Sequence, residues 1–140
     1  MTENGAQKPL ELILARNLLT SISTPAILVD SDARLLFYNE AAGALLGRSF
    51  EESGQMTAQE WTGAFGPLGD ERNPVPVEEL PLTTVLREGR PGHGTYCIRS
   101  TNGEEHTIEA SAFPLVGPNE QESGAMVLWW TRSGDGADGG

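Results

Sequence analysis

The sequence predicts an α+β domain built on antiparallel strands. Three observations lead to this prediction: an amphipathic helix pattern opens the chain, a pair of strand patterns follows it, and three more strand patterns close the chain after a helical middle. A chain of 140 residues has room for one such domain with one substantial core. The expected order is therefore helix, two strands, several helices and three strands.

The first element is a helix over residues 10–22, within a flanking segment 9–23. Apolar residues recur here every four positions, which places them on one face of a helix, and Pro25 prevents its continuation. The stripe consists of Leu10, Ile13, Leu14, Leu18, Leu19 and Ile22.

A β-hairpin is expected next, because two short apolar runs, 26–29 and 35–38, flank a turn-prone acidic stretch. A helix over 40–46 follows, since Asn39 is a good N-cap and Gly47 a good left-handed C-cap. The chain thus leaves its first hairpin directly into a helix.

Two capping boxes, Ser49 with Glu52 and Thr57 with Glu60, predict two brief helices between residues 50 and 65. Glycine and proline are frequent over 66–76, which is typical of a loop.

A further helix is indicated by Leu82, Val85 and Leu86, which stand at helical spacing. Pro81 is compatible with its first turn, and Gly89 stops it.

The strongest local signal is the dipeptide Asn102-Gly103 between two strand patterns, which predicts a hairpin with a two-residue turn. In that register Cys97 faces Ile108, and Arg99 faces His106. One face of the sheet would then carry Cys97, Arg99, His106, Ile108 and Ala110.

The last strand pattern, 125–130, is apolar on both faces, so the strand is expected to be central or covered on both sides. Its adjacent tryptophans, Trp129 and Trp130, must face opposite sides of the sheet.

Composition narrows the function classes. The 20 acidic and 9 basic residues leave a net charge of −11, which disfavours nucleic acid and anionic membranes as partners. No apolar run is long enough to span a membrane, and the start lacks a secretory signal pattern. The single cysteine, Cys97, suits a reducing compartment, so we expect a cytoplasmic protein. The polar ends, 1–8 and 133–140, are expected to be disordered.

With this element order in view, the stretch 25–47, which reads PAILVDSDARLLFYNEAAGALLG, resembles the N-terminal half of a PAS domain. The second half agrees in ELPL at 79–82, REGRP at 87–91, the Asn102-Gly103 hairpin and FPL at 113–115, and the resemblance covers 24–132. It implies a five-stranded antiparallel sheet with short helices on one face, enclosing a pocket. It also implies a sensor or dimerisation module of bacterial origin rather than an enzyme.

The resemblance raises the question of a cofactor. Flavin photosensors of this family carry a cysteine in a helix that corresponds here to 57–65, which has none, and haem sensors take a His from the helix at 78–88, which also has none. Covalent flavin and haem are therefore disfavoured, His93 is expected to be a solvated loop residue, and the cofactor stays open.

No catalytic or metal-binding set is expected. Cys97 and His106 alone do not make a zinc site, which needs three or four ligands. The carboxylate doublets place neighbouring side chains in different directions, and no nucleophile or phosphate-binding motif is present. An unfamiliar enzymatic site would rest on Arg99, His106 and Cys97.

The expected pocket has apolar walls and polar ends. Its residues are Trp61, Phe65, Leu82, Leu86, Cys97, Arg99, His106 and Trp129. Arg99 would meet a ligand carboxylate there, or else pair with Glu109 or lie at the surface. A filled core without a ligand fits the same residues equally well.

The second tryptophan, Trp130, needs a cover, which the N-terminal helix of the same chain or of a second copy would supply. The expected dimer interface is Leu10, Ile13, Leu14, Leu18, Ile22 and Trp130, and a plain core role for the helix is the alternative. The charge distribution favours a dimer interface on this helix, because residues 1–24 have no net charge: Glu3 and Glu11 balance Lys8 and Arg16.

These observations favour a PAS sensory or signalling module that acts by small-molecule sensing, by homodimerisation, or through a signalling protein partner. The alternatives are a ligand carrier and a sensor fragment of a longer signalling protein. Where effector-linked PAS domains end with an Asp-Ile-Thr motif, this chain has Trp129-Trp130-Thr131, which favours a free-standing module.

Overall fold

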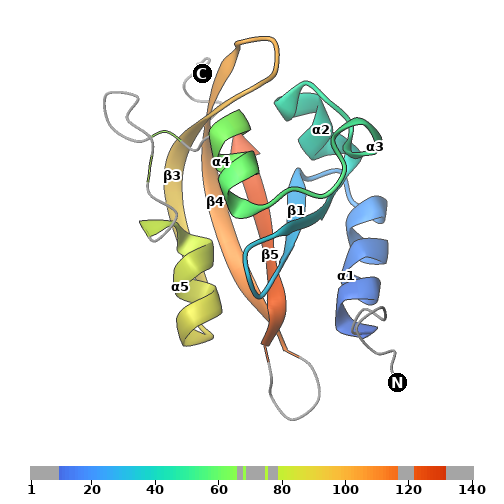
Figure 1. Ribbon diagram of the computed structural model, residues 1–140, viewed down its shortest axis with the longest axis vertical. Helices are drawn as coiled ribbons and strands as arrows, with labels where there is room; N and C mark the ends of the chain where they lie inside the picture. Colours follow the sequence, from blue (N-terminus) through green and yellow to red (C-terminus); the bar gives the residue numbers. More distant parts are fainter. Residues whose placement is uncertain (1–9, 66–67, 69–74, 76–78, 117–121, 132–140) are drawn as a thin grey trace.

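The sheet is the centre of the molecule and has five antiparallel strands in the order β2-β1-β5-β4-β3 (Figure 1). The computed structural model describes residues 10–65, 68, 75, 79–116 and 122–131. The strands are β1 (Ala26–Asp30), β2 (Leu35–Tyr38), β3 (Gly92–Arg99), β4 (Glu105–Val116) and β5 (Glu122–Thr131). The helices are α1 (Leu10–Ser21), α2 (Glu40–Leu46), α3 (Phe50–Ser53), α4 (Ala58–Phe65) and α5 (Pro81–Glu88). The predicted α+β class and element order are confirmed.

The last strand, β5, is central, as its apolar pattern predicted. It pairs with β1 on one side and with β4 on the other, so its side chains meet apolar neighbours on both faces of the sheet. Residues alternate between two hydrophobic clusters: Val127 and Trp129 belong to one, while Met126 and Leu128 pack against the other.

The two clusters lie on opposite faces of the sheet. We call the face that packs against α2, α4 and α5 the cavity face, and its cluster includes Trp61, Leu82 and Trp129. We call the other the outer face, where α1 contacts β1, β4 and β5 (Figure 1). The sheet is thus covered by helices on both sides, although α1 covers only part of the outer face.

Local caps fix the helix ends as the sequence predicts. Asn39 caps α2, Gly47 adopts the left-handed conformation after it with φ of 83°, and Ser49 forms a complete capping box with Glu52. Pro81 stands in the first turn of α5.

Asn39 also joins α1 to the sheet, which sequence reasoning did not foresee. Its side chain is buried, and its Oδ1 accepts hydrogen bonds from the Ala26 and Ala42 amides at 3.1 and 3.0 Å. Its Nδ2 donates to the carbonyl oxygens of Leu19 and Thr24 at 3.1 and 2.8 Å. One amide therefore ties the end of α1, the start of β1 and the start of α2 together.

The predicted register of the β3–β4 hairpin is wrong by one residue. The Gly103 amide donates to the Ser100 carbonyl at 3.0 Å, and the Ser100 amide to the Glu104 carbonyl at 2.8 Å. Gly103 alone has a positive φ, 91°, so the turn is a three-residue loop ending in a left-handed glycine rather than a two-residue turn. Because side chains alternate, the shift moves Cys97 and Arg99 to the outer face.

The buried face of α1 also differs from the predicted stripe. Leu12, Ala15 and Leu19 are buried against the outer face, whereas most of the predicted stripe points to solvent. Positions 12, 15 and 19 form an equally good helical face, and the small Ala15 lets α1 approach the sheet closely.

Two predictions fall outside the described residues. The disordered ends predicted for 1–8 and 133–140 are not described, and of the loop predicted for 66–76 only Leu68 and Val75 are.

Candidate functional site

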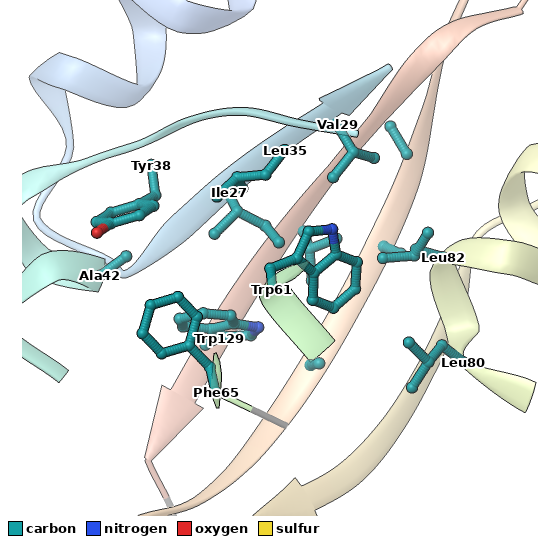
Figure 2. Packing of buried hydrophobic residues seen from close by; sticks show 14 of the residues in the cluster. Ile27, Val29, Leu35, Tyr38, Ala42, Trp61, Phe65, Leu80, Leu82 and Trp129 are labelled. Atoms are coloured by element: carbon teal, nitrogen blue, oxygen red, sulfur yellow. The ribbon is translucent and has the colours of Figure 1, made fainter. Parts of the chain in front are cut away.

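The cavity face encloses a cavity of about 60 Å³. Figure 2 shows Trp61 and Phe65 of α4, Trp129 of β5 and Leu82 of α5 pointing toward one another across the middle of the cluster. The cavity is lined by Ile27, Leu35, Tyr38, Leu46, Trp61, Phe65, Leu80, Leu82, Tyr96, Ile98, Ile108, Ala110, Val127 and Trp129.

None of the described lining residues has a charged side chain, and two of their few polar atoms are already bonded to the protein. The Trp61 indole Nε1 donates to the Ala33 carbonyl at 2.9 Å, and the Tyr38 hydroxyl donates to the Arg48 carbonyl at 2.7 Å. The cavity walls are therefore essentially apolar.

The cavity is small for a ligand site. An apolar cavity of about 150 Å³ accommodates benzene, and sites for drug-sized ligands occupy about 300–1,000 Å³. A guest much larger than a few atoms needs movement of the aromatic side chains, of which Trp61 and Phe65 belong to the short helix α4.

Four of the eight predicted pocket residues line the cavity: Trp61, Phe65, Leu82 and Trp129. Leu86 packs against the same cluster without lining it. The other three, Cys97, Arg99 and His106, do not line it.

The register shift explains where these three residues lie. Arg99 is nearly half exposed and its guanidinium is 3.8 Å from the Glu105 carboxylate, so its partner is the paired residue on β4 and not a ligand. The Cys97 Sγ is 3.8 Å from the same carboxylate. His106 stays on the cavity side, opposite Ile98, and its Nε2 is 3.9 Å from Glu104.

The exposed position predicted for His93 is confirmed, although it lies on β3 and not in a loop. Within the described ranges, no group of three or more His, Cys, Asp or Glu is arranged to hold a metal ion.

Sequence reasoning missed Tyr96 as a lining residue. Tyr96 pairs with Ile108 and faces the cavity, whereas the predicted register gave that place to Cys97. A three-residue loop with glycine in its last position was the sequence signal that would have found it.

Both tyrosines of the chain line the cavity, and burial raises the pKa of each above the usual value of 10.0. For Tyr38 the hydrogen bond with Ser53, at 2.8 Å, opposes the effect of burial on the pKa. For Tyr96 the negative charge of Glu79 adds to it.

The outer face presents a second feature, an apolar surface that α1 leaves open. Its large side chains are Leu10 (65% exposed), Leu14 (57%), Leu18 (52%), Trp130 (46%) and Ile13 (44%). The sixth predicted interface residue, Ile22, is half-buried against the outer cluster. We call these five exposed residues the apolar surface.

Trp130 stays 46% exposed, so the α1 of its own chain does not bury it completely. The Glu11 carboxylate accepts a hydrogen bond from the Ser123 hydroxyl, so that side of α1 faces β5. Leu14 and Leu18 follow Glu11 at helical spacing and so lie on the same side of α1.

None of the helices that the structure describes has the length and apolar character needed to cross a lipid bilayer.

The model of the PAS fold family matches residues 19–133 of the chain. Among solved structures, the LOV protein of Rhodobacter sphaeroides superimposes with a TM-score of 0.69 at 16% identity, covering 90% of this chain and 71% of that one. The PAS domain of Bordetella pertussis BvgS gives a TM-score of 0.59 at 14% identity, covering 86% and 84%. No curated protein matches the chain.

Proposed function

Because the chain belongs to the PAS fold family, a family of sensory and signalling modules, we propose that it senses a small molecule in the cavity and signals as a homodimer through α1 and Trp130. The proposal assigns it no catalytic role, and no nucleic-acid or membrane partner. With a single cysteine the protein suits the cytoplasm, where we place this function.

The observation that carries the proposal is the apolar surface itself. Four large apolar residues of one helix and a tryptophan of the adjacent sheet stand between 44% and 65% exposed. Exposed large apolar side chains of this kind are typical of protein interfaces, where aromatic and aliphatic anchors supply most of the binding energy.

A second copy of the chain is the partner that the charge distribution favours. Residues 1–24 have no net charge, so the whole surplus of −11 lies in 25–140. Two copies that meet through α1 therefore place an uncharged segment at the contact, whereas a contact made by the acidic bodies alone would bring like charges together.

Asn39 offers a physical connection between the two parts of the proposal. It bonds the last turn of α1 and the segment after it to β1 and α2, and Tyr38, the residue before it, lines the cavity. A guest that displaces the cavity wall would thus act close to the attachment point of the dimer helix.

A flavin or a haem does not fit these residues. The cavity is far smaller than either group, α4 has no cysteine, and α5 has no histidine. Cys97 lies on the outer face of β3, turned away from the cavity. The same small volume makes a carrier of sizeable ligands a weaker candidate than a sensor.

Light scattering across a wide range of protein concentration tests the dimer. We expect a mass of twice 15.0 kDa for the wild type and 15.0 kDa for the double variant Leu14→Glu/Leu18→Glu. The matched control is Gln59→Glu, which adds charge at an exposed position of α4, on the other side of the sheet, and should leave the dimer intact. A wild type that stays monomeric at the highest concentration would contradict the proposal.

Native mass spectrometry of freshly purified protein tests the sensor. A small molecule that is retained at one per chain and changes the dimer constant supports sensing. A retained ligand without any change in association favours a carrier instead.

A further inference from the structure

Among the lining residues that the structure describes, the cavity approaches the surface at one. Of the fourteen side chains, thirteen are buried, and only Tyr96 is partly exposed. The neighbours of Tyr96 in the lining include Leu80 and Leu82 at the start of α5, and Glu79 is near enough to influence the Tyr96 hydroxyl. The mouth of the cavity therefore lies at Tyr96, between β3 and the start of α5.

The position of the Tyr96 ring depends on a glycine. A Cβ placed on Gly94 would lie 2.7 Å from both the Cε2 and the hydroxyl oxygen of Tyr96, much closer than atoms tolerate. The ring therefore lies back across the Gly94 backbone, on the cavity face of β3, where any other residue would displace it.

The chemistry of the lining selects the guest. The described lining has no charged group, and the bonded Trp61 and Tyr38 leave little hydrogen-bonding capacity. Burying an ion in such surroundings is strongly unfavourable unless a partner charge compensates. The volume of about 60 Å³ further restricts a guest that enters without rearrangement to one smaller than benzene.

Building on the proposed sensory function, we propose that the cavity takes neutral, apolar molecules smaller than benzene, and that the Tyr96 ring, folded over Gly94, closes its mouth and sets this size limit. Tyr96 is in this sense a specificity-determining residue, and anionic guests are excluded.

Xenon provides the first test because the chain has five isoleucines in two useful groups. Ile27, Ile98 and Ile108 line the cavity, while Ile13 and Ile22 belong to the α1 region. In the full chain with labelled isoleucine δ1-methyl groups, xenon should shift the NMR signals of the first three and leave that of Ile22 unchanged; Ile13 lines a separate groove between α1 and the sheet and is not used as a reference. No shift, or equal shifts in the three lining residues and Ile22, would refute the cavity as a guest site.

Toluene and benzoate, which are alike in size but differ in charge, test the mouth and the selectivity. We expect neither to bind the wild type at moderate concentration, and toluene to bind Tyr96→Ala at least tenfold more tightly while benzoate stays excluded. Gly94→Ala, which keeps every lining side chain, should move the ring and give an intermediate gain. Tyr96→Phe keeps the ring and should behave as the wild type.

Each outcome decides a separate point. Toluene affinity unchanged in both Tyr96→Ala and Gly94→Ala overturns the role of Tyr96, and benzoate binding equal to that of toluene overturns the guest class. Native protein that is monomeric and ligand-free would remove the proposed function, yet the xenon and toluene results would still hold or fail independently. Urea denaturation of each variant verifies that it is folded.

Discussion

The adjacent residues Trp129 and Trp130 differ sharply in environment: the first is 8% exposed and the second 46%. Trp129 lies on the cavity face, under α4 and α5, whereas Trp130 lies on the outer face, which α1 covers only in part. Both faces of β5 are apolar in sequence, so the difference comes from which helices reach them.

The comparison teaches that the two faces suit different functions. The cavity face is closed around its own small cavity, so what it takes up must be small and is selected by the lining. The outer face has an apolar surface still available for a partner of matching shape. Sensing and association are thus assigned to opposite sides of one sheet, joined by Asn39.

The largest expected difference between the two faces is in the stability lost when each tryptophan is replaced by alanine. Trp129→Ala removes a buried indole from the packed cluster and should lower the free energy of unfolding by about 3–5 kcal/mol. Trp130→Ala should change it by about 1 kcal/mol, because nearly half of the side chain is already exposed to solvent in the monomer. Urea denaturation in the Leu14→Glu/Leu18→Glu background separates folding from association.

In the dimer assay the order of the two variants should be reversed. Trp130→Ala is expected to weaken association in the otherwise wild-type chain, although its effect on folding is small. Equal losses of stability in the two tryptophan variants would show that the outer face is closed within the monomer, contrary to the comparison.

The next largest expected effect comes from removing Asn39, which connects the two faces of the sheet. Asn39→Ala removes a helix cap, which is worth about 1 kcal/mol, and leaves the buried amide of Ala26 without its acceptor, which costs about 1–3 kcal/mol more. We expect a total loss of about 2–4 kcal/mol in the free energy of unfolding, measured by urea denaturation.

Ser49→Ala is the matched control, because it removes a cap without touching α1. It should cost about 1 kcal/mol. If the two substitutions cost the same, Asn39 is merely a cap, and the proposed connection between cavity and dimer helix loses its physical basis.

The cavity face was predictable in its elements but not in all of its residues. Caps, turns and helical spacing placed Trp61, Phe65 and Leu82 correctly, because each depends on local chemistry. The prediction of the pocket's polar end was wrong because of one detail, namely whether the turn at Gly103 has two residues or three. A single-residue shift reverses every side chain of a strand, so Arg99 and Tyr96 exchanged faces.

The prediction of which side of α1 packs on the outer face was wrong for a different reason. The sequence of α1 contains two apolar faces, one through Leu14 and Leu18 and one through Leu12 and Leu19, and periodicity alone does not rank them. The sheet selects the second face because Ala15 permits close packing and Arg16 then stacks over Phe37, 4.5 Å from the ring centre. Such selection depends on tertiary contacts that no local pattern contains.

The smallest expected effect, absent at neutral pH, concerns the tyrosines of the cavity face. Burial raises the pKa of Tyr38 and Tyr96 above 10.0 in the folded chain, so the unfolded chain loses these protons first as pH rises. Their contribution to stability is therefore fully present below about pH 10 and is lost as pH rises through the folded pKa values. Urea midpoints at about pH 8 and about pH 11 should reveal the loss.

The double variant Tyr38→Phe/Tyr96→Phe should reduce this alkaline loss, whatever its own stability at neutral pH. The comparison is therefore between the changes of the urea midpoint with pH and not between the midpoints themselves. Because the chain has only these two tyrosines and both line the cavity, the part of the alkaline loss that the double variant removes reports on the cavity face. An undiminished loss in the double variant would assign it to other groups, and the burial of the two hydroxyls would then contribute nothing to stability at high pH.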